Sequence, residues 1–289
     1  MNSKPNVAWR ESFRQSVEEL REAGIEDAER EAALLLELSS GRSLSEWIVD
    51  GGVWAQPAEK RMRELTRRRA GREPYHYLAG IREFMGLSVR VDPAVLIPRP
   101  ETELLVATVL AQVPDSSLTV VDVGTGSGAI ALALRRLGSA AWTIVATENS
   151  AAALQVARSN GAALGLKISW RLGSLLEPVA GPVDVIVANL PYVDEAERGQ
   201  LAPELAYEPP AALFAGRGGL AAIESLVVQA ALRFARFPSG VGGIFLEMGQ
   251  GQAPAVTALL SRHGFGMITA VADYAGVARI AVGWWRGKG

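Results

Sequence analysis

The residues best suited to chemistry form the tetrapeptide Asn189-Leu190-Pro191-Tyr192. An amide nitrogen is a poor nucleophile because its lone pair is delocalised into the carbonyl. Oδ1 of Asn189 and the backbone carbonyl of Leu190 can each accept one N–H of such a nitrogen, and positioning of this kind is a large catalytic effect. Pro191 restricts Leu190 to an extended backbone, and Tyr192 offers a flat face on which a planar amide or base can stack. The tetrapeptide therefore predicts methylation of an amide or amine nitrogen, with neither a metal ion nor a strong general base. An ordinary strand-end turn is the alternative, because Asn and Pro are common turn residues.

A glycine-rich loop runs over Asp122-Val123-Gly124-Thr125-Gly126-Ser127-Gly128. Its glycines permit a tight turn and the close approach of a ligand, and the helix that follows presents free N–H groups. Glu148 ends the next strand-like run about 20 residues later, where an acidic side chain commonly binds ribose hydroxyls. Together these features predict a cofactor that contains adenosine. A plain turn and a nicotinamide cofactor are the alternatives, although the glycines lack the G-x-G-x-x-G spacing.

Both motifs lie within an alternation of apolar strands and helices that begins near Glu101. The strand-like segments are 118–123, 142–147, 167–171, 183–188, 243–248, 266–271 and 277–284, and the helical segments are 129–137, 151–164, 220–237 and 254–263. This alternation predicts a mostly parallel sheet covered on both faces. The short link at 274–276 predicts an antiparallel hairpin at one sheet edge. Ligands bind beyond the carboxyl ends of parallel strands, so the tetrapeptide, which follows the fourth strand, should face the glycine loop.

The first part of the chain reads as a small helical bundle. Apolar residues recur at intervals of three or four from Trp9 to Leu20, which predicts one buried helical face. Ser43-Leu44-Ser45-Glu46 predicts a capping box, and Pro57 suits the first position of another helix. The predicted parts are a helical domain at 1–80, a hairpin connector at 81–100 and an α/β domain at 101–289.

The composition excludes several classes of protein. Hydrophobic residues make up 49% and charged residues 21% of the 289 residues, as expected for a packed globular chain. The formal net charge of -2 gives no global attraction to nucleic acid or to anionic membranes. The chain has no cysteine, and its two histidines, His76 and His263, lie far apart, so no metal site is predicted. With neither a secretory signal nor an apolar run of about 18 residues, the expected location is the cytoplasm.

Several further segments are typical of one enzyme family. They are Arg72-Glu73-Pro74, Tyr77-Leu78-Ala79-Gly80, Val95-Leu96-Ile97-Pro98-Arg99-Pro100-Glu101-Thr102-Glu103, the glycine loop, Tyr207-Glu208-Pro209 and Leu246-Glu247-Met248-Gly249. Through these segments the chain resembles, from Arg72 to Gly283, the glutamine-N5 methyltransferases that modify class 1 peptide chain release factors. The helical N-terminal region also matches the layout of that family.

The resemblance implies an α/β fold of the class I methyltransferase type. This fold is Rossmann-like, with a mostly parallel seven-stranded sheet and an antiparallel terminal hairpin, here joined to a small N-terminal helical domain that recognises the substrate. It also implies S-adenosyl-L-methionine as cofactor and the glutamine of a release factor's Gly-Gly-Gln loop as substrate. By matching position, the residues that hold the substrate amide are Asn189, Leu190, Pro191 and Tyr192. Those that bind the cofactor are Gly124, Thr125, Gly126, Ser127, Gly128, Glu148, Ser174, Leu175 and Asn189.

The sequence departs from the family pattern at three places. Leu190 replaces the first proline of Asn-Pro-Pro-Tyr, although its backbone carbonyl is retained. Ser174 stands where an Asp is usual beside the adenine, and 214–219 lacks the usual acids. Asn-Leu-Pro-Tyr is also similar to the motif of adenine-N6 ribosomal RNA methyltransferases, so an adenine-N6 methyltransferase acting on RNA or DNA is the main alternative. A cofactor-binding interaction module and a nicotinamide oxidoreductase are two others. Direct binding of nucleic acid is not expected for the glutamine methyltransferase.

Overall fold

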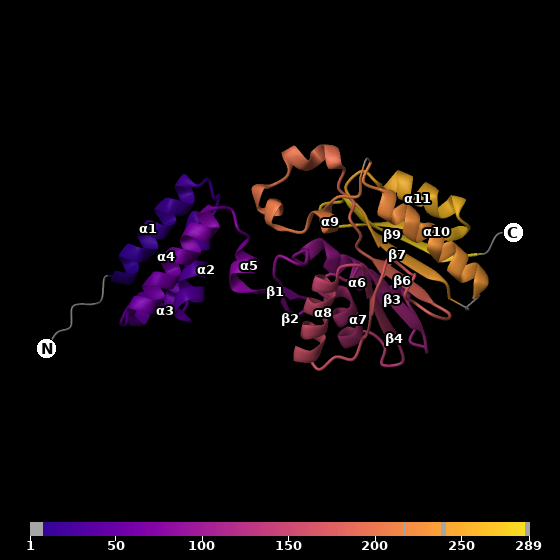
Figure 1. Cartoon of the computed structure of the whole chain (residues 1–289), viewed down its shortest axis with the longest axis horizontal. Helices are drawn as coiled ribbons and strands as arrows, with labels where there is room; N and C mark the ends of the chain where they lie inside the picture. Colours follow the sequence, from indigo (N-terminus) through magenta and orange to yellow (C-terminus); the bar gives the residue numbers. More distant parts are fainter. Residues whose placement is uncertain (1–7, 217, 238–240, 287–289) are drawn as a thin grey trace. The chain divides into compact units, whose positions relative to one another are not determined.

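The computed structural model describes residues 8–216, 218–237 and 241–286, which form two compact units (Figure 1). The first unit extends to Gly80 and includes Pro203–Tyr207, and the second comprises Ile81–Ala202 with Glu208–Gly289. Some residues of the predicted domains lie outside the described residues; they are 1–7, 217, 238–240 and 287–289.

The first unit is a bundle of helices. They are α1 (Ala8–Glu22), α2 (Ala28–Ser40), α3 (Leu44–Asp50), α4 (Gln56–Ala70), the short α5 (Tyr75–Ala79) and the 3-10 helix η2 (Pro203–Tyr207). The predicted apolar face of α1 is buried, with Trp9 4% and Leu20 0% exposed. Trp47 packs between Trp9 and Trp54, at ring-centroid distances of 5.8 Å and 5.4 Å. Helix α4 begins at Gln56, one residue before the predicted start, so Pro57 still lies in the first turn, where its missing N–H is not needed.

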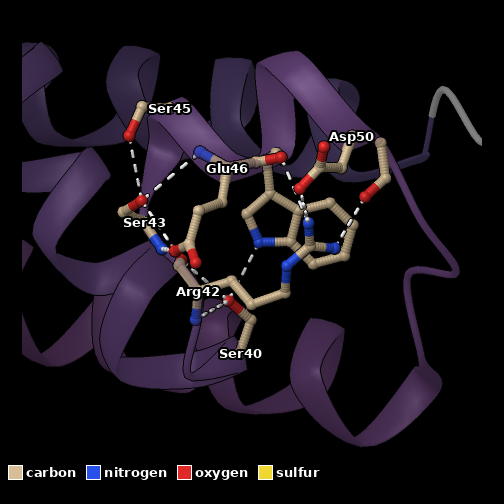
Figure 2. Close-up of polar contacts among 8 residues, drawn as sticks. Ser40, Arg42, Ser43, Ser45, Glu46 and Asp50 are labelled. Carbon is tan, nitrogen blue, oxygen red and sulfur yellow. Dashed lines mark hydrogen bonds and ion pairs between the residues drawn. The ribbon is translucent and has the colours of Figure 1, made fainter.

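The predicted capping box at the start of α3 is confirmed (Figure 2). The Oγ of Ser43 accepts a hydrogen bond from the Glu46 N–H at 3.3 Å, and the Glu46 carboxylate accepts one from the Ser43 N–H at 2.7 Å. Arg42 lies over the ring of Trp47 at 4.6 Å and donates to the carbonyl of Gly51 at 2.6 Å. The side chains around this helix start therefore fix both ends of α3.

The segment Pro203–Tyr207 joins the first unit although it follows the tetrapeptide in sequence. Glu204 accepts hydrogen bonds from Arg69 and Arg72, both at 3.1 Å. The Tyr207 hydroxyl donates to the carbonyl of Gly71 at 2.6 Å. Nothing in the sequence pattern predicted this long-range attachment.

The second unit contains a seven-stranded sheet with the order β5-β4-β3-β6-β7-β9-β8. The strands are β3 (Thr119–Val123), β4 (Thr143–Glu148), β5 (Ser169–Leu172), β6 (Val185–Ala188), β7 (Gly243–Glu247), β8 (Phe265–Ala272) and β9 (Ala278–Trp285). Strands β3 to β7 pair in parallel, and β9 pairs antiparallel with both β7 and β8. The predicted mostly parallel sheet with an antiparallel hairpin at its edge is confirmed.

Helices cover both faces of this sheet (Figure 1). They are α6 (Pro100–Gln112), α7 (Ala129–Leu137), α8 (Ala151–Ala163), α10 (Ala221–Arg236) and α11 (Ala253–Arg262). The 3-10 helix η1 (Glu195–Gln200) and the short α9 (Pro210–Leu213) lie in the segment between β6 and α10. Val120 belongs to the apolar cluster that contains residues of α6 and α7, whereas its neighbour Val121 belongs to the cluster with α10 and α11. Successive strand residues thus point to opposite faces, as the period of two requires.

The hairpin of β1 (Ile81–Phe84) and β2 (Leu87–Arg90) forms a separate two-stranded sheet within the second unit. Phe84 and Val89 are 1% and 0% exposed and lie in the same apolar cluster as α6 and α7. The hairpin predicted at 81–100 therefore contributes to the core of the second unit. None of the described helices is long and apolar enough to cross a membrane.

Candidate active site

A cavity of about 550 Å³ lies at the carboxyl ends of the parallel strands in the second unit. Its wall includes the glycine loop after β3, residues 147–150 at the end of β4, residues 173–175 after β5 and residues 189–191 after β6. This volume is in the range of small-molecule and cofactor sites. Of the predicted site residues, those on the wall are Gly124, Thr125, Gly126, Ser127, Glu148, Ser174, Leu175, Asn189, Leu190 and Pro191.

The backbone of the glycine loop has the left-handed conformation that favours glycine. Gly124, Gly126 and Gly128 have φ of +72°, +54° and +86°. The Oδ2 of Asp122 accepts hydrogen bonds from the Thr125 hydroxyl at 2.5 Å and from the backbone N–H at the start of α7 at 3.1 Å. Burial raises the pKa of Asp122 to about 7, partly opposed by the Thr125 hydrogen bond. Asp122 thus holds the loop from beneath rather than facing the cavity.

Glu148 lies at the end of β4, as predicted, and is only 8% exposed. Its Oε2 accepts the Gly126 N–H at 3.0 Å, and its Oε1 accepts the Ser150 N–H at 2.9 Å. Each carboxylate oxygen keeps a further lone pair, so Glu148 can still accept the hydroxyls of a ribose. The geometry therefore suits the predicted role of this acid.

Asn189 follows β6, whose Ala188 pairs with Val123 of β3. This register brings Asn189 to the start of the glycine loop. The Nδ2 of Asn189 donates a hydrogen bond to the Thr102 hydroxyl at 3.0 Å. The amide oxygen Oδ1 is then the group left to accept a hydrogen bond in the cavity, as the predicted chemistry requires.

Leu190 occupies the position of the missing proline with a buried side chain, 5% exposed. Its Cδ2 lies 2.9 Å from the point where a Cβ on Gly124 would stand. A larger residue at 124 would collide with Leu190, so the tetrapeptide and the glycine loop pack directly on each other. The leucine side chain thereby holds the tetrapeptide in place by packing.

Two predicted site residues, Gly128 and Tyr192, are not among those that line the cavity. Gly128 is packed beneath the loop, where an added Cβ would meet Trp170 at 3.0 Å. The Tyr192 carbonyl accepts the Gln252 amide at 2.9 Å, and burial, followed by the nearby Glu247 carboxylate, raises the pKa of the Tyr192 hydroxyl to about 12. The role of the Tyr192 ring as a stacking surface stays a prediction.

The cavity wall is also supported by acids whose roles the sequence pattern did not reveal. Glu208 is 3% exposed and accepts hydrogen bonds from the Ile97 N–H at 3.0 Å and from the Arg99 guanidinium at 2.5 Å. Glu247 ends β7 and is 1% exposed. In the sequence, Glu247 stands at the end of an apolar strand, and Glu208 stands between a tyrosine and a proline. These positions were the available signal for a buried acid, but both segments were noted only for their family resemblance.

No group of three or more potential ligands among the described residues is placed to hold a metal ion.

Comparison with known proteins adds independent evidence. Residues 11–80 match the model of the PrmC N-terminal domain, and residues 100–231 match that of the Methyltransferase small domain. A release factor glutamine methyltransferase of Deinococcus radiodurans is 37% identical over 89% of this chain and 91% of its own length. Another from Gloeobacter violaceus is 37% identical over 99% of each chain. The chain belongs to the release factor glutamine methyltransferase family. The predicted family is therefore confirmed.

Solved structures support the same fold. A methyltransferase from Pyrococcus furiosus superposes with a TM-score of 0.54 at 18% identity, covering 76% of this chain and 99% of that one. The hMettl16 catalytic domain gives a TM-score of 0.54 at 15% identity, covering 83% and 86%. At these identities the likeness concerns the fold alone, and it supports the predicted mostly parallel seven-stranded sheet with flanking helices.

Proposed function

We propose that this chain transfers a methyl group from S-adenosyl-L-methionine to the N5 side-chain amide nitrogen of the glutamine in the Gly-Gly-Gln motif of a class 1 release factor. Its family relatives carry the name release factor glutamine methyltransferase. The observation that carries the proposal is the Asn189 amide, whose Nδ2 is taken by Thr102 so that Oδ1 is the acceptor beside the glycine loop. The release factor is then the protein partner, and the reaction takes place in the cytoplasm without a direct role for nucleic acid.

The cavity fits the cofactor. A Cβ on Gly126 would meet nothing within 4 Å, so the loop leaves open space beside its backbone. The hydroxyl of Thr147 is buried on the wall without a hydrogen-bond partner, and Glu148 retains acceptor capacity for a ribose. Ser174 and Leu175 line the cavity where the adenine is proposed to lie. When bound, S-adenosyl-L-methionine supplies a methyl group activated by its positively charged sulfur.

The residues of the chain act by positioning. Oδ1 of Asn189 accepts one N–H of the substrate amide, and the backbone carbonyl of Leu190 accepts the other. These two bonds fix the direction of the nitrogen lone pair, and holding a reactant in this way can lower a barrier by several kcal/mol. The nitrogen gives up a proton after it has been methylated, so the site needs no strong base.

The names of the family relatives, rather than the lining of the cavity, favour an amide substrate over a nucleic acid base. Among the described residues that line the cavity, the one aromatic side chain is Phe214, and the Arg198 guanidinium covers its ring at 3.9 Å. Enzymes that act on an extruded base usually stack it between aromatic or apolar side chains. The apolar wall and Phe214 could also hold a base, so the adenine-N6 alternative is tested in the same assay.

The decisive experiment measures transfer of labelled methyl from S-adenosyl-L-methionine to a purified, unmethylated release factor. The matched control is the same factor with its Gly-Gly-Gln glutamine changed to alanine, and ribosomal RNA is assayed in parallel. We expect label on the wild-type factor alone. Label on the RNA, or on the alanine variant, would contradict the proposal.

A further inference from the structure

The part of the cavity wall that follows β5 is a loop, residues 173–181, which contains no helix or strand. Ser174 and Leu175 of this loop lie on the cavity wall. Leu175 has a φ of +46°, a left-handed conformation that is unfavourable for a residue with a side chain. Such a conformation persists where the surroundings hold the backbone in place. The wall beside the proposed adenine position therefore needs support from outside the loop.

Two side chains of α10 hydrogen-bond to the backbone of this loop. The Oε1 of Gln229 accepts the Leu176 N–H at 3.0 Å. The Arg233 guanidinium donates to the carbonyls of Val179 at 2.8 Å and Gly181 at 3.0 Å. It also donates to the Leu176 carbonyl at 3.1 Å. Backbone groups in a folded chain need such partners, and here the side chains of a helix supply them in place of a neighbouring strand.

The side of α10 that carries these two residues also reaches the cavity. Ser225 on the cavity wall, Gln229 and Arg233 are spaced four residues apart, so they lie along one side of the helix. Leu176 and Val179 are 1% and 6% exposed and pack in the same apolar cluster as residues of α10. On the outer side of the loop the packing is open, because a surface hollow of about 490 Å³ is lined by residues of the loop and of 229–237. The hydrogen bonds therefore hold the loop on the side where packing does not.

We propose that Gln229 and Arg233 are positioning residues that hold the 173–181 loop in the conformation that binds S-adenosyl-L-methionine. The proposal rests on, and deepens, the cofactor role proposed for this cavity. Neither side chain lies on the cavity wall, and both act through Ser174 and Leu175. Conformations in which this part of the wall is displaced do not bind the cofactor, so the measured Kd rises as the share of the binding conformation falls.

The first test compares Arg233→Met, which removes the guanidinium, with the same change at Arg236 on the same helix. The Arg236 guanidinium lies over the Phe237 ring at 5.2 Å and, in the part of the chain that the structure describes, makes no hydrogen bond to the loop. We expect Arg233→Met to raise the Kd of S-adenosyl-L-methionine, measured by calorimetry, about tenfold, which corresponds to a binding conformation populated about one tenth of the time. Arg236→Met should leave the Kd within about twofold of the wild type. An unchanged Kd in Arg233→Met would overturn the proposal.

Gln229 allows a matched pair of variants. Gln229→Met removes the acceptor of the Leu176 N–H at similar side-chain length, whereas Gln229→Glu keeps an acceptor and places a carboxylate one turn before Arg233. We expect the Kd of S-adenosyl-L-methionine to rise about fivefold in Gln229→Met, the factor for one lost hydrogen bond. It should stay within about twofold of the wild type in Gln229→Glu. Equal rises in the two variants would overturn the assignment of Gln229.

Kinetics and hydrogen exchange separate positioning of the loop from a general loss of stability. With a release factor as substrate, Arg233→Met should raise the KM of the cofactor and leave kcat at saturating cofactor within about twofold. Without cofactor, the amides of Leu176 and Val179 should exchange faster than in the wild type, while those of β3 and β7 keep their rates. Faster exchange throughout the sheet would mean that Arg233 supports only the fold, and would overturn the proposal.

The binding and exchange measurements need no release factor. A wild-type chain that binds S-adenosyl-L-methionine without methylating the release factor would refute the proposed function, while the Kd of Arg233→Met still decided the role of α10. A wild-type chain that does not bind the cofactor would refute both.

Discussion

At the residue scale, the packing of the Leu190 side chain takes the place of the backbone restriction that a proline ring would impose. A proline at this position restricts the residue before it, and a leucine does not. Leu190 instead buries its side chain among the apolar residues that join the sheet to α10 and α11, directly against Gly124. The side-chain contacts of Leu190 thus hold the tetrapeptide in place, while Pro191 still restricts the Leu190 backbone and with it the Leu190 carbonyl, one of the two proposed substrate acceptors.

Replacing Leu190 by alanine should lower the free energy of unfolding of the second unit by about 2–4 kcal/mol, because removal of a buried leucine side chain loses apolar contacts and leaves a cavity. Denaturant unfolding measures the change. Leu232→Ala is the matched control, since Leu232 is 67% exposed, and its effect should stay within about 0.5 kcal/mol. Leu190→Pro, which restores the family residue, should retain activity. Equal effects of Leu190→Ala and Leu232→Ala would show that Leu190 does not support the tetrapeptide.

Asn189→Ala should reduce kcat by about 100-fold or more, because loss of one positioned hydrogen-bonding group in an active site has this order of effect. The variant should keep its fold, since Asn189 is only partly buried at a strand end. Single-turnover methyl transfer with a saturating release factor measures the chemical step. If the variant keeps kcat within threefold of the wild type, the tetrapeptide does not take part in methyl transfer through Asn189.

The buried carboxyl of Glu247 should also make stability depend on pH. Its pKa is raised from 4.5 to about 7 in the folded state, so between these values the folded chain binds a proton that the unfolded chain does not. Stability therefore falls as the pH rises through this window, by at most about 3 kcal/mol, and the full penalty is present above pH 7. Thermal unfolding of Glu247→Gln and wild type at pH 5 and pH 8 measures it. Relative to the wild type, the stability of the variant should be higher at pH 8 than at pH 5. An equal difference in stability at both pH values would contradict the raised pKa of Glu247.

At the element scale, the sequence pattern predicted the seven strands of the large sheet and the helices α7, α8, α10 and α11 to within about two residues, because each lies in one layer of a regular core. The helices α6 and α9 were not among the predicted segments. The segment expected at 129–137 is α7 at Ala129–Leu137, and Glu148 ends β4 as expected. The same periodicity cannot reveal partners that are distant in sequence. Glu208 and Glu247 read as ordinary acids in the sequence. Only the folded chain shows that both are buried and that Glu208 accepts hydrogen bonds from Ile97 and Arg99.

The start of α3 offers a test of local sequence rules in the first unit (Figure 2). Ser43→Ala removes the hydroxyl that accepts the Glu46 N–H. We expect local opening of α3 to become about fivefold more frequent, the factor that corresponds to a lost N-cap. Hydrogen exchange of the α3 amides measures this opening. Ser45→Ala is the control, because the Ser45 hydroxyl hydrogen-bonds to the Ser43 hydroxyl rather than to a backbone N–H of the helix start. In this variant the exchange of the α3 amides should stay near the wild-type rate.

At the scale of the whole molecule, the chain passes between the two units three times, after Gly80, after Ala202 and after Tyr207. The middle segment, Pro203–Tyr207, follows the tetrapeptide in sequence and immediately precedes Glu208, the acid that accepts hydrogen bonds from Ile97 and Arg99. A part of the first unit is therefore encoded within the catalytic half of the sequence. A fragment that ends at Gly80 lacks this part, and we expect it to be less stable than the same unit in the full chain.

Glu204→Ala in the full chain tests the contribution of that segment directly. The Arg69 side chain is 9% exposed and pairs with both Glu204 and Glu31, so loss of Glu204 leaves a buried guanidinium with one carboxylate fewer. We expect the free energy of unfolding of the first unit to fall by about 1–3 kcal/mol. Hydrogen exchange of the α2 and α4 amides should quicken accordingly, while exchange in β3 and β6 stays unchanged. Glu197→Ala, at an exposed position in η1, should leave all of these rates as they are. Unchanged protection of α2 and α4 in Glu204→Ala would mean that Pro203–Tyr207 contacts the helical bundle without stabilising it.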